Sequence, residues 1–362
     1  MNRLLELFSG TGGASLGLRR AGWAHLACIE WNASAAETLR AADFPAVEAD
    51  VRDIHFRPWR GKVDLFWASP PCQAGSAAGK RRGEEDDRNG WPWTFDALDE
   101  VQPTWFLAEN VVGWTYHREH CEVGGPCTGC YWERSILPAL AERFPFSGFW
   151  KLNAADYGVP QHRRRVILWG GPLPLSPDGP PKSHADPTDP DALLEGRKPW
   201  ITLEEAIGDT LLDPDTCGRR ACYACSLGRA CREHWRRHAP APTVTTMEEK
   251  GTRANAASGF TFHGGPDRAS DTAFLVAGVR RIDVAEGLKL QDFPSDWPLR
   301  GTRHDHYTQV GNAVPPALAE ACGRLVRGAH AVWTGLRRDG VNPVVMGRML
   351  QRRGLELGRQ RP

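Results

Sequence analysis

Cys72 is the residue of this chain whose neighbours most favour a role as a nucleophile. It follows two prolines, and the basic residues Lys80, Arg81 and Arg82 come soon after it. A free thiol has a pKa near ~8.5, so it becomes a good nucleophile only where its surroundings favour the thiolate. A lone cysteine is more often an inert, buried apolar side chain. Its assignment as a nucleophile therefore depends on the other segments of the chain.

Two further kinds of reactive group stand at the ends of apolar runs. Glu109 closes one run, and Arg163 and Arg165 lead into another. A carboxyl group can hold or donate a proton, and a guanidinium group can hold a carbonyl oxygen or a phosphate. Alternation along a strand places Arg163 and Arg165 on one face and Arg164 on the other. We expect the pair to point toward Cys72 and Glu109.

The elements that position these groups begin with a strand, a glycine turn and a helix. Residues 4–8 are apolar except for Glu6, residues 9–13 form a glycine-rich turn, and residues 14–21 have helical spacing. Such a turn lets the backbone approach a ligand closely, and the start of the helix offers unpaired N–H groups. It predicts a cofactor loop.

Two more predicted strands carry carboxylates at their ends. Glu30 ends residues 25–30, about twenty residues after the glycines, and Asp50 lies at the tip of residues 47–51. A carboxylate there can accept hydrogen bonds from ribose hydroxyls, and Trp31 can lie against an adenine ring. The pattern favours a nucleoside-binding, doubly wound α/β sheet. The alternative is a similar sheet whose acids are ordinary loop residues.

Composition separates the remaining parts of the chain. Helical spacing is predicted over residues 33–41, 133–143 and 317–327, whereas residues 170–190 are rich in Pro, Gly and Asp, as at a domain boundary. Residues 333–362 hold seven Arg against one Asp and one Glu, so we expect a solvated helix or an auxiliary nucleic-acid contact. The whole chain has 45 basic and 44 acidic residues, so any nucleic-acid site must come from local patches.

Ten cysteines and no secretory leader predict a cytoplasmic protein with reduced thiols. No apolar run approaches the length of a membrane span, so we expect no membrane contact. Two groups of cysteines have the spacing of tetrahedral zinc sites, with reduced surface thiols as the alternative. The favoured group is Cys217, Cys222, Cys225 and Cys231, and the other is Cys121, Cys127 and Cys130 with His120 as fourth ligand and His117 nearby.

Taken in order, these segments resemble the DNA cytosine-5 methyltransferase family along most of the chain. The likeness rests on a cofactor loop, a nucleophile motif, an acid motif, an arginine motif and a final motif, which are, in turn, residues 8–13, Pro71-Cys72-Gln73, Glu109-Asn110-Val111, Gln161 with Arg163 and Arg165, and Gln309-Val310-Gly311-Asn312. One departure is Gly75, where the family usually has Phe.

The resemblance implies an α/β fold, with a Rossmann-like class I S-adenosylmethionine-dependent methyltransferase sheet and a smaller, irregular target-recognition domain. Residues 1–171 would form the catalytic and cofactor-binding domain, 172–278 the recognition domain, 279–332 the return to the catalytic domain and 333–362 a basic tail. S-Adenosylmethionine is the implied cofactor. The residues expected to bind it are Phe8, Gly10, Thr11, Gly12, Gly13, Glu30, Trp31, Asp50, Val51, Pro71 and Asn312.

The implied substrate is a cytosine flipped out of duplex DNA. Carbon 5 of cytosine is a poor nucleophile, so Cys72 would first add to carbon 6, while Glu109 holds or donates a proton at ring nitrogen 3. Arg165 would hold the base carbonyl, and Arg163 would support the Cys72 loop or a phosphate. The residues expected to contact DNA are Lys80, Arg81, Arg82, Arg88, Arg219 and Arg220.

We therefore predict a monomeric DNA cytosine-5 methyltransferase of a restriction-modification or phage-protection system. A cognate restriction endonuclease would be a functional partner that the chain need not bind. One alternative is an enzyme that acts on a tRNA cytosine or transfers another one-carbon group, and the basic recognition region argues against tRNA. Another is a catalytically silent DNA-binding homologue, which would have no need of Cys72 or Glu109.

Overall fold

A seven-stranded sheet forms the centre of the computed structural model, which describes residues 2–72, 88–117, 121, 127–208, 240–241, 246–247, 262–263 and 283–352. Its order is β3-β2-β1-β4-β5-β7-β6. The strands are β1 (Arg3–Leu7), β2 (Ala24–Glu30), β3 (Ala46–Glu48), β4 (Leu65–Ala68), β5 (Trp105–Val111), β6 (Phe146–Asn153) and β7 (Arg164–Gly171). Neighbours pair in parallel except at β7, which is antiparallel to β5 and to β6. The predicted α/β sheet is confirmed.

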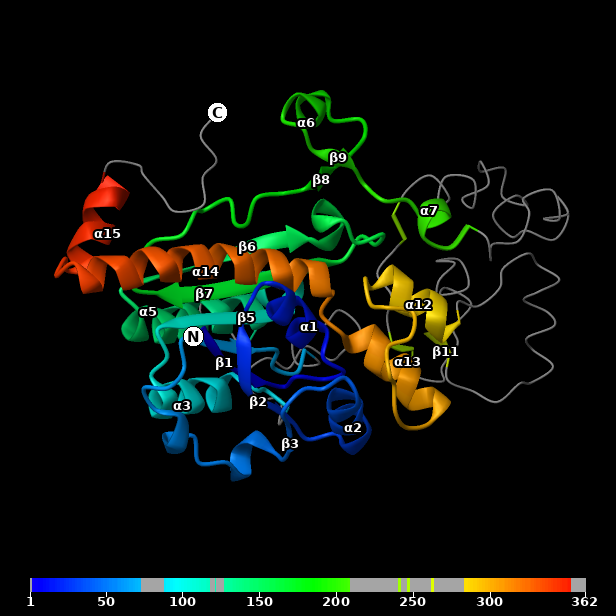
Figure 1. Ribbon diagram of the computed structural model, residues 1–362, viewed down its shortest axis with the longest axis horizontal. Coiled ribbons are helices and arrows are strands. Elements are labelled where there is room, and N and C mark those ends of the chain that lie inside the picture. The colour runs from blue at the N-terminus through cyan, green and yellow to red at the C-terminus, as the bar shows by residue number, and fades with distance from the viewer. Residues whose placement is uncertain are drawn as a thin grey trace, which may run out of the picture.

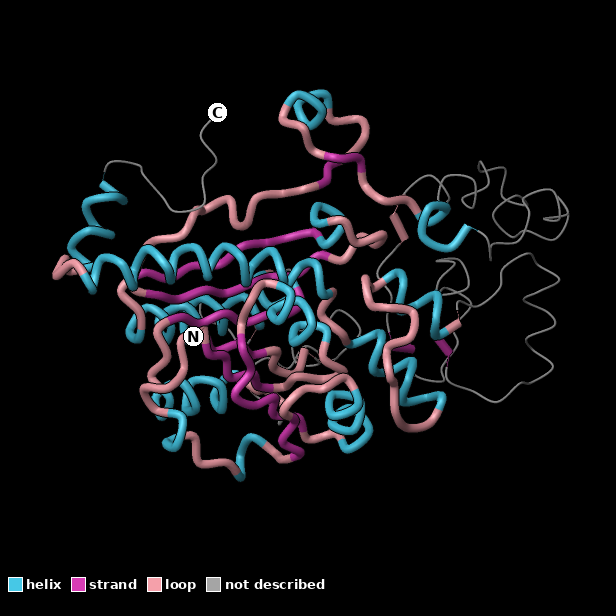
Figure 2. The backbone as a smooth tube through the Cα atoms, viewed as in Figure 1, coloured by secondary structure: helices cyan, strands magenta, loops and turns pink. Residues whose placement is uncertain are grey.

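Helices cover both faces of this sheet, which explains why its central strands β1, β4 and β5 are buried over almost their whole length. α3 (Trp91–Val101) and α5 (Leu137–Arg143) pack against one face, and α1 (Gly13–Arg20) and α14 (Pro316–Arg338) pack against the other. α2 (Ala33–Ala41) connects β2 to β3. Figure 1 shows the long helix α14 running in the direction of β6 and β7, and Figure 2 shows the strands between the helices.

Shorter elements lie between the strands and helices of the sheet. They are η1 (Val51–Asp53), η2 (Arg57–Trp59), η4 (Val112–Thr115), α4 (Thr128–Tyr131), the π-helical η5 (Trp132–Ile136) and η6 (Ala154–Tyr157). The helix predicted over residues 133–143 thus starts earlier, at α4, and contains a π-helical stretch before α5. β6 was not anticipated, because exposed and buried residues mix along this edge strand.

Residues after β7 divide between the sheet and a separate group of helices. Leu173 and Leu175 are buried in the core beneath α14, and the indole nitrogen of Trp150 donates to the Ser176 carbonyl at 2.8 Å. β8 (His184–Ala185), α6 (Pro190–Leu194) and β9 (Lys198–Pro199) follow. α7 (Leu203–Ile207), α12 (Val284–Leu290) and α13 (Arg303–Asn312) gather at one end of the molecule (Figure 1), with the short strands β10 (Thr246–Met247) and β11 (Phe262–His263).

The C-terminal helices pack on the sheet more extensively than the sequence suggested. α14 continues to Arg338, beyond the predicted end at residue 327, and Trp333 and Leu336 lie against the core. α15 (Pro343–Arg352) adds Val344 to the same core. The predicted basic tail therefore begins inside a packed helix.

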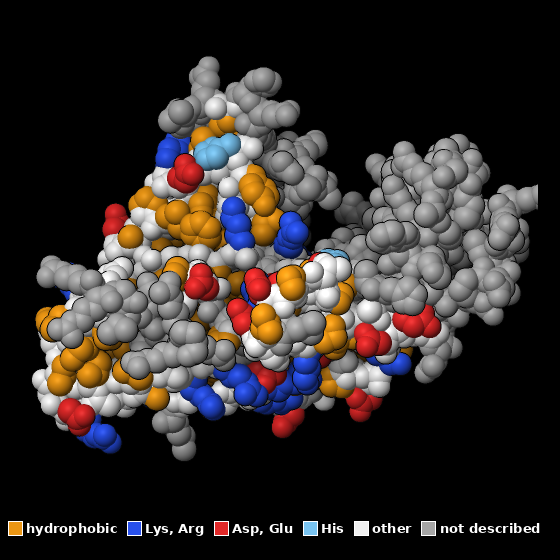
Figure 3. All heavy atoms as spheres, turned by 90° about the horizontal axis from the view of Figure 1, so that it is seen from above, with side chains coloured by type: hydrophobic (Ala, Val, Ile, Leu, Met, Phe, Trp, Pro, Cys, Tyr) orange, Lys and Arg blue, Asp and Glu red, His pale blue; other side chains and the backbone are white. Residues whose placement is uncertain are grey.

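The described surface mixes charges of both signs. Figure 3 shows Lys and Arg side chains along one edge of the upper face, with Asp and Glu side chains among them. Among the described helices, none is both long enough and apolar enough to cross a membrane.

Glycine permits the close approach of α1 to α14. A Cβ atom on Gly17 would overlap the carbonyl oxygen of Pro316 and would lie 2.8 Å from the amide nitrogen of Glu320. Both of those atoms belong to backbone at the start of α14, so neither can move without shifting the helix. By contrast, a Cβ atom on Gly328, further along α14, would meet nothing within 4 Å.

Matched glycine substitutions test this contact. Gly17→Ala should lower the free energy of unfolding by about 1–3 kcal/mol through overpacking, although alanine is the better helix former. Gly328→Ala should raise it by up to about 1 kcal/mol, because only the helix propensity changes. Urea unfolding of both variants and the native chain measures the difference. Equal effects at the two positions would contradict the close packing of α1 on α14.

Candidate active site

The turn between β1 and α1 has the strained backbone that its glycines predict. Gly10 and Gly12 have φ values of 54° and 91°, and Phe8 also has a positive φ, of 56°. A Cβ atom on Gly10 would meet nothing within 4 Å, because this residue faces a cavity. A Cβ atom on Gly13 would overlap the carbonyl oxygen of Val314, so the turn is pressed against the chain just before α14.

Glu30, at the end of β2, holds this turn in place. Its Oε2 atom accepts a hydrogen bond from the Gly10 amide at 2.7 Å, and its Oε1 atom accepts one from the Asn32 amide at 2.8 Å. Burial raises the pKa of the Glu30 carboxyl, while the amide donors at Asn32 and Gly10 act in the opposite direction. The indole ring of Trp31, beside it, is 73% exposed. A flat aromatic surface therefore stands at the rim of the cavity.

The cavity beside this turn has a volume of about 320 Å³. That is at the lower end of the roughly 300–1,000 Å³ typical of small-molecule sites. The predicted site residues that line it are Phe8, Gly10, Thr11, Glu30, Trp31, Pro71, Cys72, Glu109 and Asn312. The structure thus brings the predicted cofactor loop, nucleophile and acid to one cavity. Gly12 lies close to Leu39 of α2, and like Gly13 it shapes the turn.

A smaller cavity of about 110 Å³ shares Phe8, Trp31 and Pro71 with the first. Asp50 and Val51 line it, as does Arg88, a predicted DNA contact. Asp50 caps η1 by accepting from the Arg52 amide at 2.9 Å, and its carboxylate also pairs with the Arg52 guanidinium. The hydrogen bonds and charge of Arg52 lower the pKa of Asp50.

Glu109 and Arg165 form an ion pair across β5 and β7. The Nε atom of Arg165 lies 2.7 Å from Oε1 of Glu109, and both residues are less than 10% exposed. In the antiparallel register Arg165 pairs with Val111, two residues beyond Glu109, so both side chains lie on one face of the sheet. Arg163 is also buried, whereas Arg164 is exposed, which confirms the predicted alternation.

Cys72 lies at the end of the described segment that follows β4. Burial raises the pKa of its thiol, and the negative charge of Glu109 adds to the rise. The positive charges of Arg165 and Arg163 act in the opposite direction. The side-chain amide of Asn110 donates to the Pro70 carbonyl at 2.9 Å, which ties the backbone before Cys72 to the end of β5.

Arg163 links the arginine motif to the final motif. Its Nη2 atom donates to the carbonyl oxygen of Gly311 at 3.0 Å, and only 2% of the residue is exposed. Burial lowers its pKa, and the nearby charge of Arg165 adds to the effect. Its position next to α13 is therefore that of an internal support.

Gln309 is a site residue whose role the sequence analysis did not anticipate, although it begins the final motif. Its Oε1 atom accepts from the hydroxyls of Thr11 at 3.0 Å and Thr38 at 2.8 Å. Its Nε2 atom donates to the Arg300 carbonyl at 2.8 Å. The amide side chain thus joins the cofactor turn, α2 and α13 through buried hydrogen bonds.

Several predicted site residues lie outside the described residues. They are the DNA contacts Lys80, Arg81, Arg82, Arg219 and Arg220, and the metal ligands His120, Cys217, Cys222, Cys225 and Cys231. Of the predicted metal ligands, the structure describes Cys121, Cys127 and Cys130, and it places them beside His117.

Comparison with known proteins agrees with this site. Residues 2–327 match the model of the C-5 cytosine-specific DNA methylase family. Type II methyltransferase M.NgoMIV of Neisseria gonorrhoeae is 28% identical over 339 residues, which cover 89% of this chain and 96% of that relative. Type II methyltransferase M.PspPI of Psychrobacter sp. is 30% identical over 343 residues, which cover 89% of this chain and 78% of that relative.

Solved structures share the fold. EhMeth, a methyltransferase of Entamoeba histolytica, superposes with a TM-score of 0.58 at 13% identity, covering 88% of this chain and 95% of its own. The Dnmt2 methyltransferase of S. pombe gives a TM-score of 0.54 at 16% identity, covering 90% and 97%. The sheet order, the shared cavity and the match over most of the chain lead to one assignment. The chain belongs to the C-5 cytosine-specific DNA methylase family and is a DNA cytosine-5 methyltransferase.

Proposed function

We propose that this enzyme methylates carbon 5 of a flipped cytosine in a specific duplex DNA sequence, with Cys72, Glu109, Arg163 and Arg165 as its catalytic and supporting residues. The observation that carries the proposal is the cavity that Cys72 and Glu109 share with the cofactor turn. Glu109 is held there by Arg165 at 2.7 Å. A nucleophile, an acid and a cofactor loop at one cavity are what this reaction requires.

The chemistry assigns a task to each of these groups. The Cys72 sulfur adds to carbon 6 of the ring, which converts carbon 5 into an enamine carbon able to attack an electrophile. Glu109 supplies or holds the proton at ring nitrogen 3, so that negative charge does not accumulate on the ring. After carbon 5 gains its methyl group, it loses its proton to a base. Cys72 then leaves carbon 6 as a thiolate, and the ring double bond re-forms.

Base binding and thiol activation are coupled through Glu109. In the free protein the charge of Glu109 opposes ionisation of the buried Cys72 thiol. When Glu109 shares a proton with ring nitrogen 3, that repulsion weakens and the positive charges of Arg165 and Arg163 favour the thiolate. The nucleophile therefore ionises more readily once a cytosine is in place.

The two arginines divide their work according to burial. Arg165 lies in the site against Glu109, where it can hold the carbonyl oxygen of the base. The burial of Arg163 and its bond to the Gly311 carbonyl favour support of the site over contact with a phosphate.

The residues around the cofactor turn fit S-adenosylmethionine, which the family uses and which supplies an electrophilic methyl group. Gly10 leaves open space where any other residue would carry a side chain. Glu30 presents a carboxylate to the same cavity for ribose hydroxyls, and the exposed ring of Trp31 can cover an adenine. Asp50 and Val51 would line the adenine-binding end of the cofactor site, and Asn312 and Pro71 would border the end that holds the methyl group.

The biological setting that we propose is a Type II modification system, because the relatives described above are Type II methyltransferases. In such a system methylation protects the cell's own DNA from a cognate endonuclease. We propose that the enzyme acts as a monomer and need not bind that endonuclease. Arg88, at the edge of the smaller cavity, is the described candidate for a phosphate contact.

The first test follows the methyl group. With S-adenosylmethionine carrying a labelled methyl group and mixed-sequence duplex DNA, the native protein should label carbon 5 of cytosine. Cys72→Ala and Cys72→Ser should lose at least about 10³-fold in rate, because the unactivated ring cannot attack. In the same reaction mixture, DNA containing 5-fluorocytosine should form a covalent complex with the native protein but not with the Cys72 variants. Fluorine takes the place of the carbon 5 proton, so the step that releases Cys72 cannot follow. Unimpaired labelling by Cys72→Ala would contradict the proposal.

A second test measures the ionisation of Cys72. The rate at which iodoacetamide alkylates Cys72, measured by peptide mass spectrometry, should rise with pH. It should reach half its maximum at a pH above the pKa of an ordinary thiol. Glu109→Gln removes a negative charge, so it should lower the pKa of Cys72 and speed alkylation at neutral pH. Arg165→Met should slow it. Glu37→Gln, exposed on α2, is the control and should match the native rate. Slower alkylation in Glu109→Gln would overturn the coupling.

A third test addresses the cofactor turn. Glu30→Gln keeps the shape of the side chain but removes its charge and one acceptor oxygen, so cofactor affinity should fall roughly tenfold or more. Isothermal titration calorimetry with S-adenosylmethionine measures this change, and Glu37→Gln again serves as the control. Native affinity in Glu30→Gln would mean that the cofactor lies elsewhere.

A further inference from the structure

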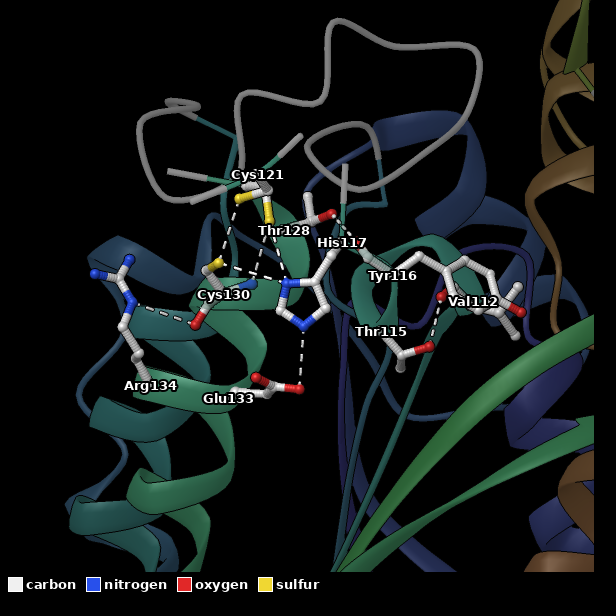
Figure 4. A network of polar contacts seen from close by, with 10 residues as sticks. Val112, Thr115, Tyr116, His117, Cys121, Thr128, Cys130, Glu133 and Arg134 are labelled. Carbon is white, nitrogen blue, oxygen red and sulfur yellow. Dashed lines mark hydrogen bonds and ion pairs between the residues drawn. The ribbon is translucent and has the colours of Figure 1, made fainter. Parts of the chain in front are cut away.

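A group of sulfur and nitrogen ligands lies outside the active site, between the end of η4 and α4. His117, Cys121, Cys127 and Cys130 each bring one potential ligand atom, and these atoms all lie within 4.8 Å of one another. Figure 4 shows His117, Cys121 and Cys130 turned toward a common point. The three cysteines are not joined in disulfides.

The spacing of the ligand atoms matches a tetrahedral zinc ion. Zinc bonds of about 2.3 Å to sulfur and about 2.1 Å to nitrogen place two sulfurs about 3.8 Å apart, and a sulfur and a nitrogen about 3.6 Å apart. The Sγ atoms of Cys121 and Cys130 are separated by 3.5 Å. The Nδ1 atom of His117 lies 3.5 Å from the Cys130 Sγ and 3.7 Å from the Cys127 Sγ. These three distances are within about 0.3 Å of the ideal values, so the group is large enough to hold one ion.

Neighbouring groups orient these ligands as they do in metal sites. The Nε2 atom of His117 lies 3.2 Å from the Glu133 carboxylate, which fixes its proton there and leaves Nδ1 free to bind a metal. The Cys130 amide donates to the Cys127 sulfur at 3.4 Å, a contact that stabilises a thiolate. Figure 4 shows Glu133 on the side of the ring away from the cysteines.

We propose that His117, Cys121, Cys127 and Cys130 form a structural zinc site. Three thiolates and an imidazole in tetrahedral array favour zinc over calcium or magnesium, which prefer oxygen ligands. All four positions are taken by the chain, so no position remains for water or substrate and the ion has a structural role. The site uses His117, where the sequence suggested His120.

The zinc site braces both sides of the active site. Thr128, next to Cys127, donates to the Gly113 carbonyl at 3.0 Å, in the segment that follows the acid strand β5. On the other side, the Tyr131 hydroxyl accepts from the side-chain amide of Asn89 at 3.2 Å. Asn89 precedes Gly90, where a Cβ atom would lie 2.7 Å from the Pro71 ring.

Aromatic packing extends the same brace into the core. The Trp114 ring meets the Trp91 ring edge-on at 6.2 Å and lies 6.0 Å from the Tyr131 ring. Trp91 starts α3, and Trp114 belongs to η4. An ion bound at the cluster would therefore hold the segment after Glu109 against the residues that pack on the Cys72 loop.

Metal content tests the site without any methyl transfer. Protein expressed with zinc and purified without chelator should contain zinc when measured by inductively coupled plasma mass spectrometry. Cys127→Ser/Cys130→Ser should contain one zinc per chain fewer than the native protein. Cys222→Ser/Cys225→Ser, in the other cysteine group, should retain the zinc of this site. Equal zinc in the native chain and in Cys127→Ser/Cys130→Ser, or no zinc in either, would overturn the proposal.

A milder variant guards against misfolding. Glu133 is largely exposed, so Glu133→Gln should fold normally and bind zinc about 10- to 100-fold more weakly in competition with a chromogenic chelator. Glu142→Gln, exposed in α5, removes the same charge and should match the native affinity. Identical affinities in the two variants would contradict the role of Glu133.

Hydrogen exchange tests the brace itself. Removal of zinc should speed amide exchange in residues 112–117 and 127–131 and around Asn89, while β6 and β7 stay protected. Unchanged exchange in those segments would show that the ion supports nothing there. Failure of methyl transfer alone would leave all these measurements intact, so this proposal and the proposed function can fail separately.

Discussion

The active site depends on one antiparallel strand. In a parallel sheet every strand ends at the same edge, so only carboxyl ends reach the cofactor. Because β7 runs the other way, its first residues arrive at that edge and bring Arg165 against Glu109. A buried carboxylate needs a positive partner, and the reversed strand supplies it. Burial raises the pKa of the Cys72 thiol, Glu109 adds to the rise, and Arg165 opposes it.

A second constraint ties the beginning of the chain to its end. Gln309 accepts hydrogen bonds from Thr11 and Thr38, and the Trp297 indole donates to the Thr11 carbonyl at 3.0 Å. Gly13 lies against the backbone of Val314. The final motif therefore holds the turn between β1 and α1 in place from the far end of the chain.

Much of the fold followed from local sequence. The strand, glycine turn and helix at the start of the chain are found where their apolar pattern and glycines placed them. Glu30 lies at the end of β2, as predicted. The prediction was possible because hydrophobic runs and turn residues mark strand boundaries. β6 escaped prediction because edge strands mix exposed and buried residues. The reversed pairing of β7 and the use of Gln309 depend on contacts between distant segments, which local patterns do not encode.

The cysteine group shows the same limit on a smaller scale. Spacing alone did not select His117, which the position of η4 brings to the sulfurs, whereas His120 and the other cysteine group lie outside the described residues. Which histidine faces a cysteine pair depends on how the preceding helix ends and turns. That direction is a property of the packed structure.

The contact between α1 and α14 also bears on how the enzyme is made. Gly17 contacts the backbone of Pro316 and Glu320. The face of α1 that packs on α14 therefore stays exposed until most of the chain has been synthesised. Contacts between residues so far apart in sequence form slowly and leave apolar surface open to aggregation in the meantime. The turn between β1 and α1 is likewise completed only by residues from the last fifth of the chain, Trp297, Gln309 and Val314. A chain that terminates before Gln309 therefore lacks the residues that hold this turn.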